Sequence, residues 1–452
     1  MRDQAVLLER GAWRLADHLV ASRAMAGNPV LEFSKAGFAD TTYATTGSSQ
    51  TGIAVVLRTI PAASDTSWVE DHRSACALPA VPSGTATVAT LPDPFTRWDG
   101  TAVTTRADWS CRREEIGAQF EAAEFGAKPR HPQSTTGAMT DDSTITVTVT
   151  DQGKTVSFHA SIVKPYFGGT APYPAIISLG GNALMGATFS LPVATVVFTP
   201  YDSVSNSMAD DGPLSRGKGI FYDLNGSNAS AGELMAWSWG ISRLIDALAT
   251  TPGSKNDVRH LAVTGCSRNG KGALVAGAFD ERIALTIPQE PGSGGASAWR
   301  LVADEIASGT KVQPLAEATT EAAWFQKDFG TVYGNAPGKL PVDHHELAAM
   351  VAPRGLLVIE NSIDWLGLNS TYGTGKAAAE IFGAMGADSS FTYSQDSTHD
   401  HCALPSDQYH WVQSFVKKFL LGQTGEAPAV ESQVPRVFDR SKWIPWTVPV
   451  LR

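Results

Sequence analysis

One serine stands in a turn that could expose a nucleophile. The segment VRHLAVTG (258–265) reads as a strand, and GCSRNGKGALVAGAF continues it as a tight turn and then a helix. Ser267 lies in this turn, where a hydroxyl is held above the sheet and helix-terminal N–H groups can receive an oxyanion. The spacing departs from the strict Gly-x-Ser-x-Gly elbow, because Gly270 follows Ser267 by three residues rather than two. A serine that only caps the helix is the alternative.

A serine nucleophile needs a base, and an α/β hydrolase carries its histidine on the loop after the last strand. SFTYS ends such a strand, and His399 and His401 follow before the final helix. His401 is favoured because its neighbour Cys402 could pair with Cys266, the neighbour of Ser267. A disulfide holds its two Cα atoms about 4.4 to 6.8 Å apart, so this bond would keep base and nucleophile together.

The same turn nearly matches a phosphate-binding loop. Gly265, Gly270 and Lys271 reproduce the GxxxxGK spacing, but Gly272 stands where a serine or threonine hydroxyl would bind Mg²⁺. A nucleotide-binding protein is therefore the rival from a different class. Thermal protection by a nucleotide would support it.

A second cluster suggests a metal site. His344, His345 and Glu346 are consecutive, so their side chains diverge, and the helical H-E-x-x-H spacing is missing. We expect these residues to be structural and the protein to need no metal or other cofactor.

Composition limits the classes of partner. The 452 residues are 43% hydrophobic and 18% charged, which is enough apolar material for a large core. No apolar run approaches the roughly 20 residues of a membrane span. The formal net charge of −10 repels phosphate backbones, so we expect neither a membrane nor a nucleic acid as partner. Four cysteines allow two disulfides in three pairings, and the 42 glycines and 26 prolines suit an extracellular chain.

The N-terminal segment fits this interpretation poorly. Residues 1–75 begin with a stretch broken by charges that has no recognisable signal peptide, and they show weak periodicity. We expect a secreted protein whose gene model or expressed sequence starts wrongly; an intracellular protein with reduced cysteines is the alternative. Residues 1–75 are predicted to be an extension, partly disordered, and residues 76–452 a single catalytic domain.

The elements of that domain alternate. TITVTVT and TVSFHASIVK are separated by turn residues and predict a hairpin, and AGELMAWSWGISRLIDALA has helical spacing. Further strands are predicted in PAIISLG, PVATVVFTP, VRHLAVTG, RIALTIP, RGLLVIEN and SFTYS. An antiparallel hairpin followed by strands that alternate with helices predicts an α/β sheet covered by helices.

Several dispersed motifs resemble the fungal glucuronoyl esterases, carbohydrate esterase family 15. They occur in order from CALP, LPDPF and WSCRREEI through GCSRNGKGALVAGAFD, IPQEPGSGGASAWR, DHHELAAMVAPRGLLVIE, IDWLG and HCALP to WIPWTVP. The resemblance implies an α/β-hydrolase fold, a single three-layer sandwich with a mostly parallel sheet. It also implies cleavage of esters that join the 4-O-methyl-glucuronic acid of glucuronoxylan to lignin alcohols. We expect a monomer.

The resemblance assigns roles residue by residue. It places the nucleophile on Ser267, the histidine on His401, the triad acid on Glu290 and the oxyanion-stabilising side chain on Arg268. The residues that bind the uronic acid fall on Lys271, Gln313, Glu321 and Trp365. Cys266 and Cys402 match one disulfide of the family and Cys76 and Cys111 another, while a third is missing because the fungal pattern ACWR reads SAWR here.

Some alternatives stay open. Asp364 follows the strand RGLLVIEN, where many α/β hydrolases carry the acid, and it competes with Glu290. Another carbohydrate esterase, such as one that removes acetyl groups, and a catalytically silent carbohydrate-binding protein are the rival functions. Glycosylation of Asn225, Asn228 and Asn369, each in N-x-S/T, is undecided.

Overall fold

The protein is described by a computed structural model that separates into two compact units, Met1–Trp68 and Val69–Arg452. The described residues are 4–8, 20–22, 30–34, 41–44, 53–57, 68–71, 76, 78, 87–201, 207–395, 399–423, 431–432, 436 and 438–451. The division after Trp68 falls a few residues before the boundary at 75 and 76 that the sequence suggested. The predicted disorder of residues 1–75 concerns a segment that lies mostly outside the described residues.

The first unit contains two small antiparallel sheets. Strands β1 (Gln4–Leu8) and β5 (Ile53–Leu57) form one of them. The other has the order β2 (Val20–Ser22), β3 (Val30–Ser34) and β4 (Thr41–Ala44).

The second unit is built on one sheet, in which ten described strands have the order β15-β14-β13-β12-β11-β9-β10-β8-β7-β6. Their bounds are Ser134–Met139 (β6), Thr144–Asp151 (β7), Lys154–Val163 (β8), Tyr173–Leu179 (β9), Ala194–Phe198 (β10), Asn256–Cys266 (β11), Leu285–Gln289 (β12), Gly355–Glu360 (β13), Phe391–Gln395 (β14) and Glu431–Ser432 (β15). Strands β6, β7 and β8 pair antiparallel, and every pairing from β10 through β9 to β15 is parallel. The mostly parallel sheet is thereby confirmed.

The predicted hairpin is present as β7 and β8. Its two-residue turn consists of Gln152 and Gly153, which have φ of 48° and 76°. Positive φ at both positions matches the twist of the flanking strands, which makes such turns the favoured hairpin connection. The burial of β7 alternates, with Ile145, Val147 and Val149 fully buried, because one face of this pair covers the core and the other meets solvent.

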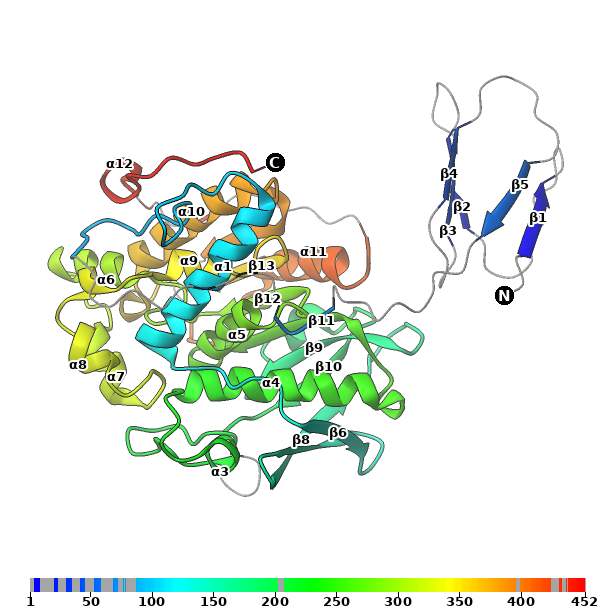
Figure 1. Ribbon diagram of the computed structural model, residues 1–452, viewed down its shortest axis with the longest axis horizontal. Coiled ribbons are helices and arrows are strands. Elements are labelled where there is room, and N and C mark those ends of the chain that lie inside the picture. Colours follow the sequence, from blue (N-terminus) through cyan, green and yellow to red (C-terminus); the bar gives the residue numbers. More distant parts are fainter. Residues whose placement is uncertain are drawn as a thin grey trace. The chain divides into compact units, whose positions relative to one another are not determined.

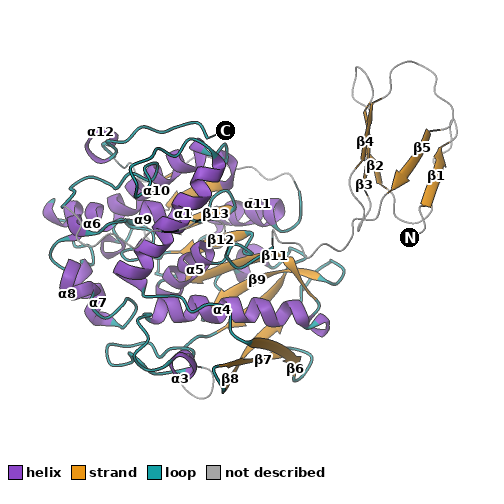
Figure 2. Ribbon diagram, in the orientation of Figure 1, coloured by secondary structure: helices purple, strands orange, loops and turns teal. Residues whose placement is uncertain are grey.

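Helices cover both faces of the sheet (Figures 1 and 2), as a three-layer sandwich requires. Helices α4 and α5 pack on each other and on the strands of one face, and α9 packs on α1, α5 and α10. Helices α2 and α11 contact each other and form the opposite layer over β12 and β13. The α-helices are Arg106–Phe120 (α1), Met185–Thr188 (α2), Ile220–Asn225 (α3), Glu233–Thr250 (α4), Arg268–Phe279 (α5), Trp299–Ala307 (α6), Leu315–Glu321 (α7), Phe329–Tyr333 (α8), His344–Ala349 (α9), Leu368–Ala384 (α10), Tyr409–Phe419 (α11) and Arg440–Trp443 (α12).

Helix α11 shows why these helices adhere to the sheet. Its Val412, Phe415 and Val416 follow helical spacing and are fully buried. They join Ile287 of β12 and Leu357 of β13 in one apolar cluster. Because these strands are parallel, their carboxyl ends meet at one edge, and the loops at that edge carry the residues that the sequence singled out. Across the described stretches, none of the helices has both the length and the apolar character needed to cross a membrane.

Candidate active site

The turn after β11 holds Ser267 in a backbone conformation that serines rarely adopt. Its φ is 60° and its ψ is −126°, between the last residue of β11 and the first of α5. The Ser267 N–H donates to the Gln289 carbonyl at 2.9 Å, and the Lys271 N–H donates to the Ser267 carbonyl at 3.0 Å. A strained residue that its neighbours hold so firmly is typical of a functional site.

Two glycines make this turn possible. A Cβ on Gly265 would lie 2.6 Å from the Asn269 carbonyl oxygen, and one on Gly270 would lie 2.5 Å from the Gln289 carbonyl oxygen. The second glycine is therefore required three residues after the serine, because α5 lies too close to the backbone of β12 there for a side chain. Asn269 occupies the position of the usual glycine and donates from Nδ2 to the Tyr201 hydroxyl at 2.9 Å.

His401 and Glu290 lie in direct contact. The His401 Nδ1 donates to Glu290 Oε2 at 2.6 Å, and the backbone N–H of Cys402 donates to the same oxygen at 3.0 Å. Glu290 follows β12 with φ of 45° and is fully buried. His401 Nε2 is buried and has no hydrogen-bond partner among the described residues. This nitrogen is therefore available for the proton of a nucleophile.

A disulfide ties the two halves of this site together. Cys266, the last residue of β11, is bonded to Cys402, and their Cα atoms are 5.7 Å apart. Ser267 follows the first cysteine and His401 precedes the second. Both sulfur atoms lie within 4.8 Å of a His401 ring nitrogen. Because both cysteines are used in the bond, they offer no thiolate to a metal ion. The other predicted pair, Cys76 and Cys111, is also bonded.

The competing carboxylate, Asp364, and the competing histidine, His399, have different surroundings from Glu290 and His401. Asp364 is exposed at the start of the 3₁₀ turn Asp364–Leu366. His399 contacts Asn361, whose Nδ2 lies 3.1 Å from His399 Nδ1 and 3.0 Å from the His399 carbonyl oxygen. The same Asn361 Nδ2 lies 3.4 Å from Glu290 Oε2. Asn361 therefore links the loop before His401 to the carboxylate that contacts it.

Three of the predicted substrate-binding residues form a group beside the histidine. Gln313 Nε2 donates to Glu321 Oε2 at 2.6 Å, and the Gln313 N–H donates to the Trp365 carbonyl at 3.2 Å. The Trp365 ring lies with its centroid 4.7 Å from that of His401 and is 43% exposed. Glu321 Oε1 is 3.7 Å from Nη2 of Arg268. Polar groups next to an exposed ring can hold the hydroxyls and the apolar face of a sugar.

Lys271 lies deeper than its helical position suggested. Its side chain is buried, its Nζ donates to the Pro291 carbonyl at 2.6 Å, and Nζ is 5.3 Å from the centre of the Trp324 ring. Burial lowers the pKa of Lys271 to about 8, and the nearby carboxylates of Glu360 and Glu321 limit this decrease. The resemblance assigned Lys271 to the substrate, and its ammonium also supports the turn after Glu290.

Sequence reasoning missed Glu360, which ends β13 and is fully buried. Its Oε1 accepts the Gly292 N–H at 3.0 Å. Burial raises the pKa of Glu360 well above its ordinary value, and the carboxylate of Glu290 raises it further. Glu360 therefore holds the turn after Glu290 through this hydrogen bond. The sequence did contain a signal for Glu360, because it is a charged residue at the carboxyl end of an otherwise apolar strand.

The residues His344, His345 and Glu346 belong to the core, as the sequence predicted. They lie in α9, which begins with a capping box between Asp343 and Glu346. His344 contacts Glu124 at 2.9 Å, and His345 Nε2 lies 2.9 Å from the Pro92 carbonyl oxygen. All three side chains are buried in internal polar contacts.

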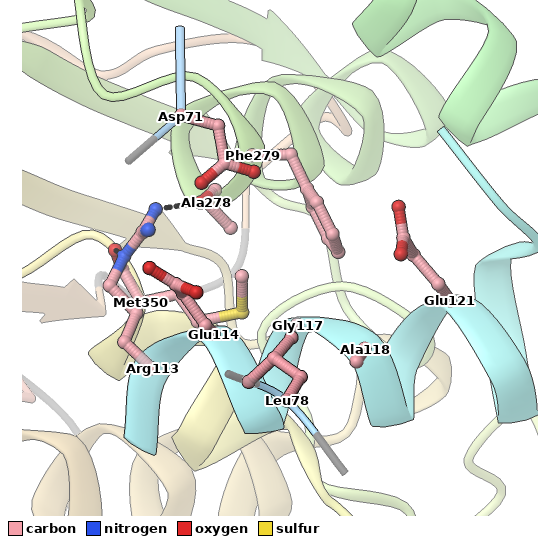
Figure 3. A pocket seen from close by; sticks show the side chains of 10 residues that line it. All are labelled: Asp71, Leu78, Arg113, Glu114, Gly117, Ala118, Glu121, Ala278, Phe279 and Met350. Carbon is pink, nitrogen blue, oxygen red and sulfur yellow. Dashed lines mark hydrogen bonds between the residues drawn. The ribbon is translucent and has the colours of Figure 1, made fainter. Parts of the chain in front are cut away.

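Figure 3 shows a cavity of about 40 Å³ at the far end of α5. Ala278 and Phe279 line it, and Arg113 donates to the Ala278 carbonyl there. A helix rises about 1.5 Å per residue, so this cavity lies roughly 17 Å along α5 from Ser267. It does not belong to the site described above.

Comparisons with known proteins show to which family this chain belongs. A family model described as glucuronyl esterase, fungi, matches residues 147–386. The 4-O-methyl-glucuronoyl methylesterase of Hypocrea jecorina is 44% identical over 363 residues, which are 80% of this chain and 76% of that protein. The protein of the same name from Neurospora crassa is 43% identical over 368 residues, 81% of this chain and 91% of the relative.

Solved structures extend the likeness to the fold. The glucuronoyl esterase catalytic domain of Hypocrea jecorina has a TM-score of 0.78 and 42% identity, and the match covers 83% of this chain and 100% of that one. A mutant of the Sporotrichum thermophile enzyme, with a serine replaced by alanine, was solved in complex with methyl 4-O-methyl-β-D-glucopyranuronate. It has a TM-score of 0.77 and 41% identity over 82% of this chain and 99% of that one. The α/β-hydrolase fold is thus confirmed, and the chain belongs to the fungal glucuronoyl esterase family.

Proposed function

We propose that this protein is a serine-type esterase that cleaves the ester between the 4-O-methyl-D-glucuronic acid of glucuronoxylan and lignin alcohols. The observation that carries the proposal is the contact between His401 and the buried Glu290, next to a disulfide that fixes His401 near Ser267. The names of the relatives, 4-O-methyl-glucuronoyl methylesterases, support the same acyl group.

The reaction follows from the positions of these groups. Ser267 Oγ attacks the ester carbonyl carbon while His401 Nε2 takes the hydroxyl proton, and Glu290 stabilises the imidazolium. The bond between carbon and alcohol oxygen then breaks, and the alcohol leaves with the proton from His401. Water, deprotonated by the same nitrogen, attacks the carbonyl carbon of the glucuronoyl ester of Ser267. The bond to Ser267 Oγ then breaks, His401 returns the proton to this oxygen, and the glucuronic acid is released.

The negative charge of each tetrahedral intermediate needs a partner. Arg268 is the first residue of α5 and directly follows Ser267, so its backbone N–H belongs to the helix terminus next to the nucleophile. We assign Arg268 to the oxyanion. Gln313, Glu321, Trp365 and Lys271 are assigned to the sugar. Trp365 adjoins His401, Glu321 adjoins Arg268, and Gln313 contacts both Trp365 and Glu321. Lys271 lies one helical turn after Ser267.

A single comparison tests the proposed function. We expect kcat/KM for benzyl glucuronate to exceed the value for 4-nitrophenyl acetate, and acetylated xylan to release little acetate. Faster release of acetate from xylan would instead indicate an acetyl esterase. Binding of xylan without hydrolysis of any of the three would indicate a silent carbohydrate-binding protein.

The buried lysine gives the enzyme a pH signature. The ammonium of Lys271 predominates below its pKa of about 8 and is lost above it. Because a charged donor binds sugar oxygens more strongly than a neutral one, we expect KM for benzyl glucuronate to rise as the pH increases through about 8. The Lys271→Met variant should have a higher KM that stays constant over this range. A KM of the native enzyme that does not change between about pH 7 and about pH 9 would contradict the assignment.

We also propose that the protein is secreted and acts as a monomer. Two disulfides support an oxidising compartment, and one chain supplies all of the proposed catalytic groups. Among the three sequons, Asn228 and Asn369 are exposed, whereas Asn225 is half-buried and donates from Nδ2 to the Phe221 carbonyl at 2.9 Å. Asn228 and Asn369 are the better candidates for glycans.

A further inference from the structure

The long side chain next to the nucleophile depends on a residue from a distant loop. The Arg268 side chain is 39% exposed, and a free arginine samples many rotamers, so holding it in one position costs conformational entropy. Its Nη1 donates to Oδ2 of Asp211, a residue in the connection between β10 and α3. Asp211 precedes Arg268 by 57 residues, so this contact depends on the folded state.

Asp211 is itself fixed by a second contact. Its other oxygen, Oδ1, accepts the indole N–H of Trp324 at 3.2 Å. Trp324 is 2% exposed, and Cζ of Arg268 lies 5.7 Å from the centre of its ring. The guanidinium is therefore held by a largely buried carboxylate and by the face of a buried aromatic ring.

The other acidic groups nearby are weaker partners. Glu321 is 3.7 Å from Arg268, is 39% exposed and is already bonded to Gln313. Burial raises the pKa of Glu233, which lies near Asp211, to about 8, so Glu233 carries little negative charge at neutral pH. The Asp211 side chain, 11% exposed, is thus the principal charge partner of Arg268.

We infer that Asp211, held by Trp324, is a positioning residue that keeps the Arg268 guanidinium beside the oxyanion during ester hydrolysis. This inference rests on the proposed function. Asp211 contacts Arg268 and Trp324, so its contribution to the reaction passes through Arg268. Loss of Asp211 should lower kcat more than it raises KM, because charge on the carbonyl oxygen develops only in the transition state.

A double-mutant cycle on benzyl glucuronate tests the inference. We expect Asp211→Asn to lower kcat about 10-fold or more with KM changed less than about twofold, since a charge-assisted hydrogen bond is lost. In the Arg268→Ala background, Asp211→Asn should change kcat by less than about twofold. Trp324→Phe keeps a ring but removes the N–H, and its smaller effect on kcat should also vanish in that background. Asp304→Asn, which breaks an exposed ion pair with Lys442, is the matched control and should leave kcat unchanged.

The outcomes separate cleanly. An equal loss of kcat with and without Arg268, or no loss from Asp211→Asn, overturns the inference, and so does an Arg268→Ala variant with native kcat. If Asp211→Asn fails to fold, kcat of Trp324→Phe is compared in the native and the Arg268→Ala backgrounds. An equal loss of kcat in both backgrounds, or no loss in either, then overturns the inference. Failure of the native protein to hydrolyse benzyl glucuronate would instead overturn the proposed function.

Discussion

Replacement of Ser267 by alanine should lower kcat by several orders of magnitude, on the scale of about 10⁴- to 10⁶-fold seen for triad serines. The residue accepts the acyl group, so no other side chain can replace it in the first step. Substrate binding should remain measurable, because Gln313, Glu321 and Trp365 are unchanged. The measurement is hydrolysis of benzyl glucuronate, with binding of the same ester to the variant followed by calorimetry.

The control is Ser110→Ala, which removes an exposed hydroxyl from α1 and should leave kcat unchanged. EDTA should also have no effect, because Ser267, His401, Glu290 and the oxyanion donors supply every catalytic group. Residual activity of more than a few per cent in Ser267→Ala would mean that the nucleophile is another residue.

The second large effect should distinguish the two candidate acids. We expect Glu290→Gln to lower kcat by about 10³- to 10⁴-fold, because an uncharged amide can neither stabilise the imidazolium nor hold the correct tautomer of His401. Asp364→Asn should lower it far less, because Asp364 is exposed on the turn that presents Trp365. Each substitution keeps the size of the side chain nearly unchanged and removes only its charge. A comparison of kcat for the two variants on the same substrate therefore shows which of the two charges the reaction needs.

Thermal unfolding of both variants is the control for structural damage. The reverse order of effects would move the acid to Asp364. Equal and modest losses would mean that the two carboxylates share the role.

The sequence predicts the framework well because local patterns determine it. The strand before Ser267, the hairpin with Gln152 and Gly153, and the helix Glu233–Thr250 all follow from period and turn chemistry within short segments. The proposal for His401 also used local information, since its neighbouring cysteine suggested a bond to the cysteine beside Ser267. That bond is present.

What sequence reasoning missed depends on contacts between distant segments. Asp211 is one acidic residue of a polar loop, and only the fold brings it to Arg268 and Trp324. The choice between Glu290 and Asp364 is of the same kind, because both follow strands that end at one edge of the sheet. The resemblance assigned Lys271 to the substrate, and nothing local in the sequence indicated its burial against the segment after Glu290.

The backbone conformations described above have a consequence for how such a protein changes over evolutionary time. Of the described residues other than glycine, five have positive φ, and three of them are Ser267, Glu290 and Cys402. Each such position costs about 1–3 kcal/mol for a residue with a side chain, and glycine would remove much of this cost. Glycine at Ser267 would therefore stabilise the fold while it abolishes catalysis, whereas glycine at Cys402 would also break the disulfide to Cys266. Without selection for the reaction, random drift would erase this site before it damaged the sheet, and the descendants would keep the fold as inactive proteins.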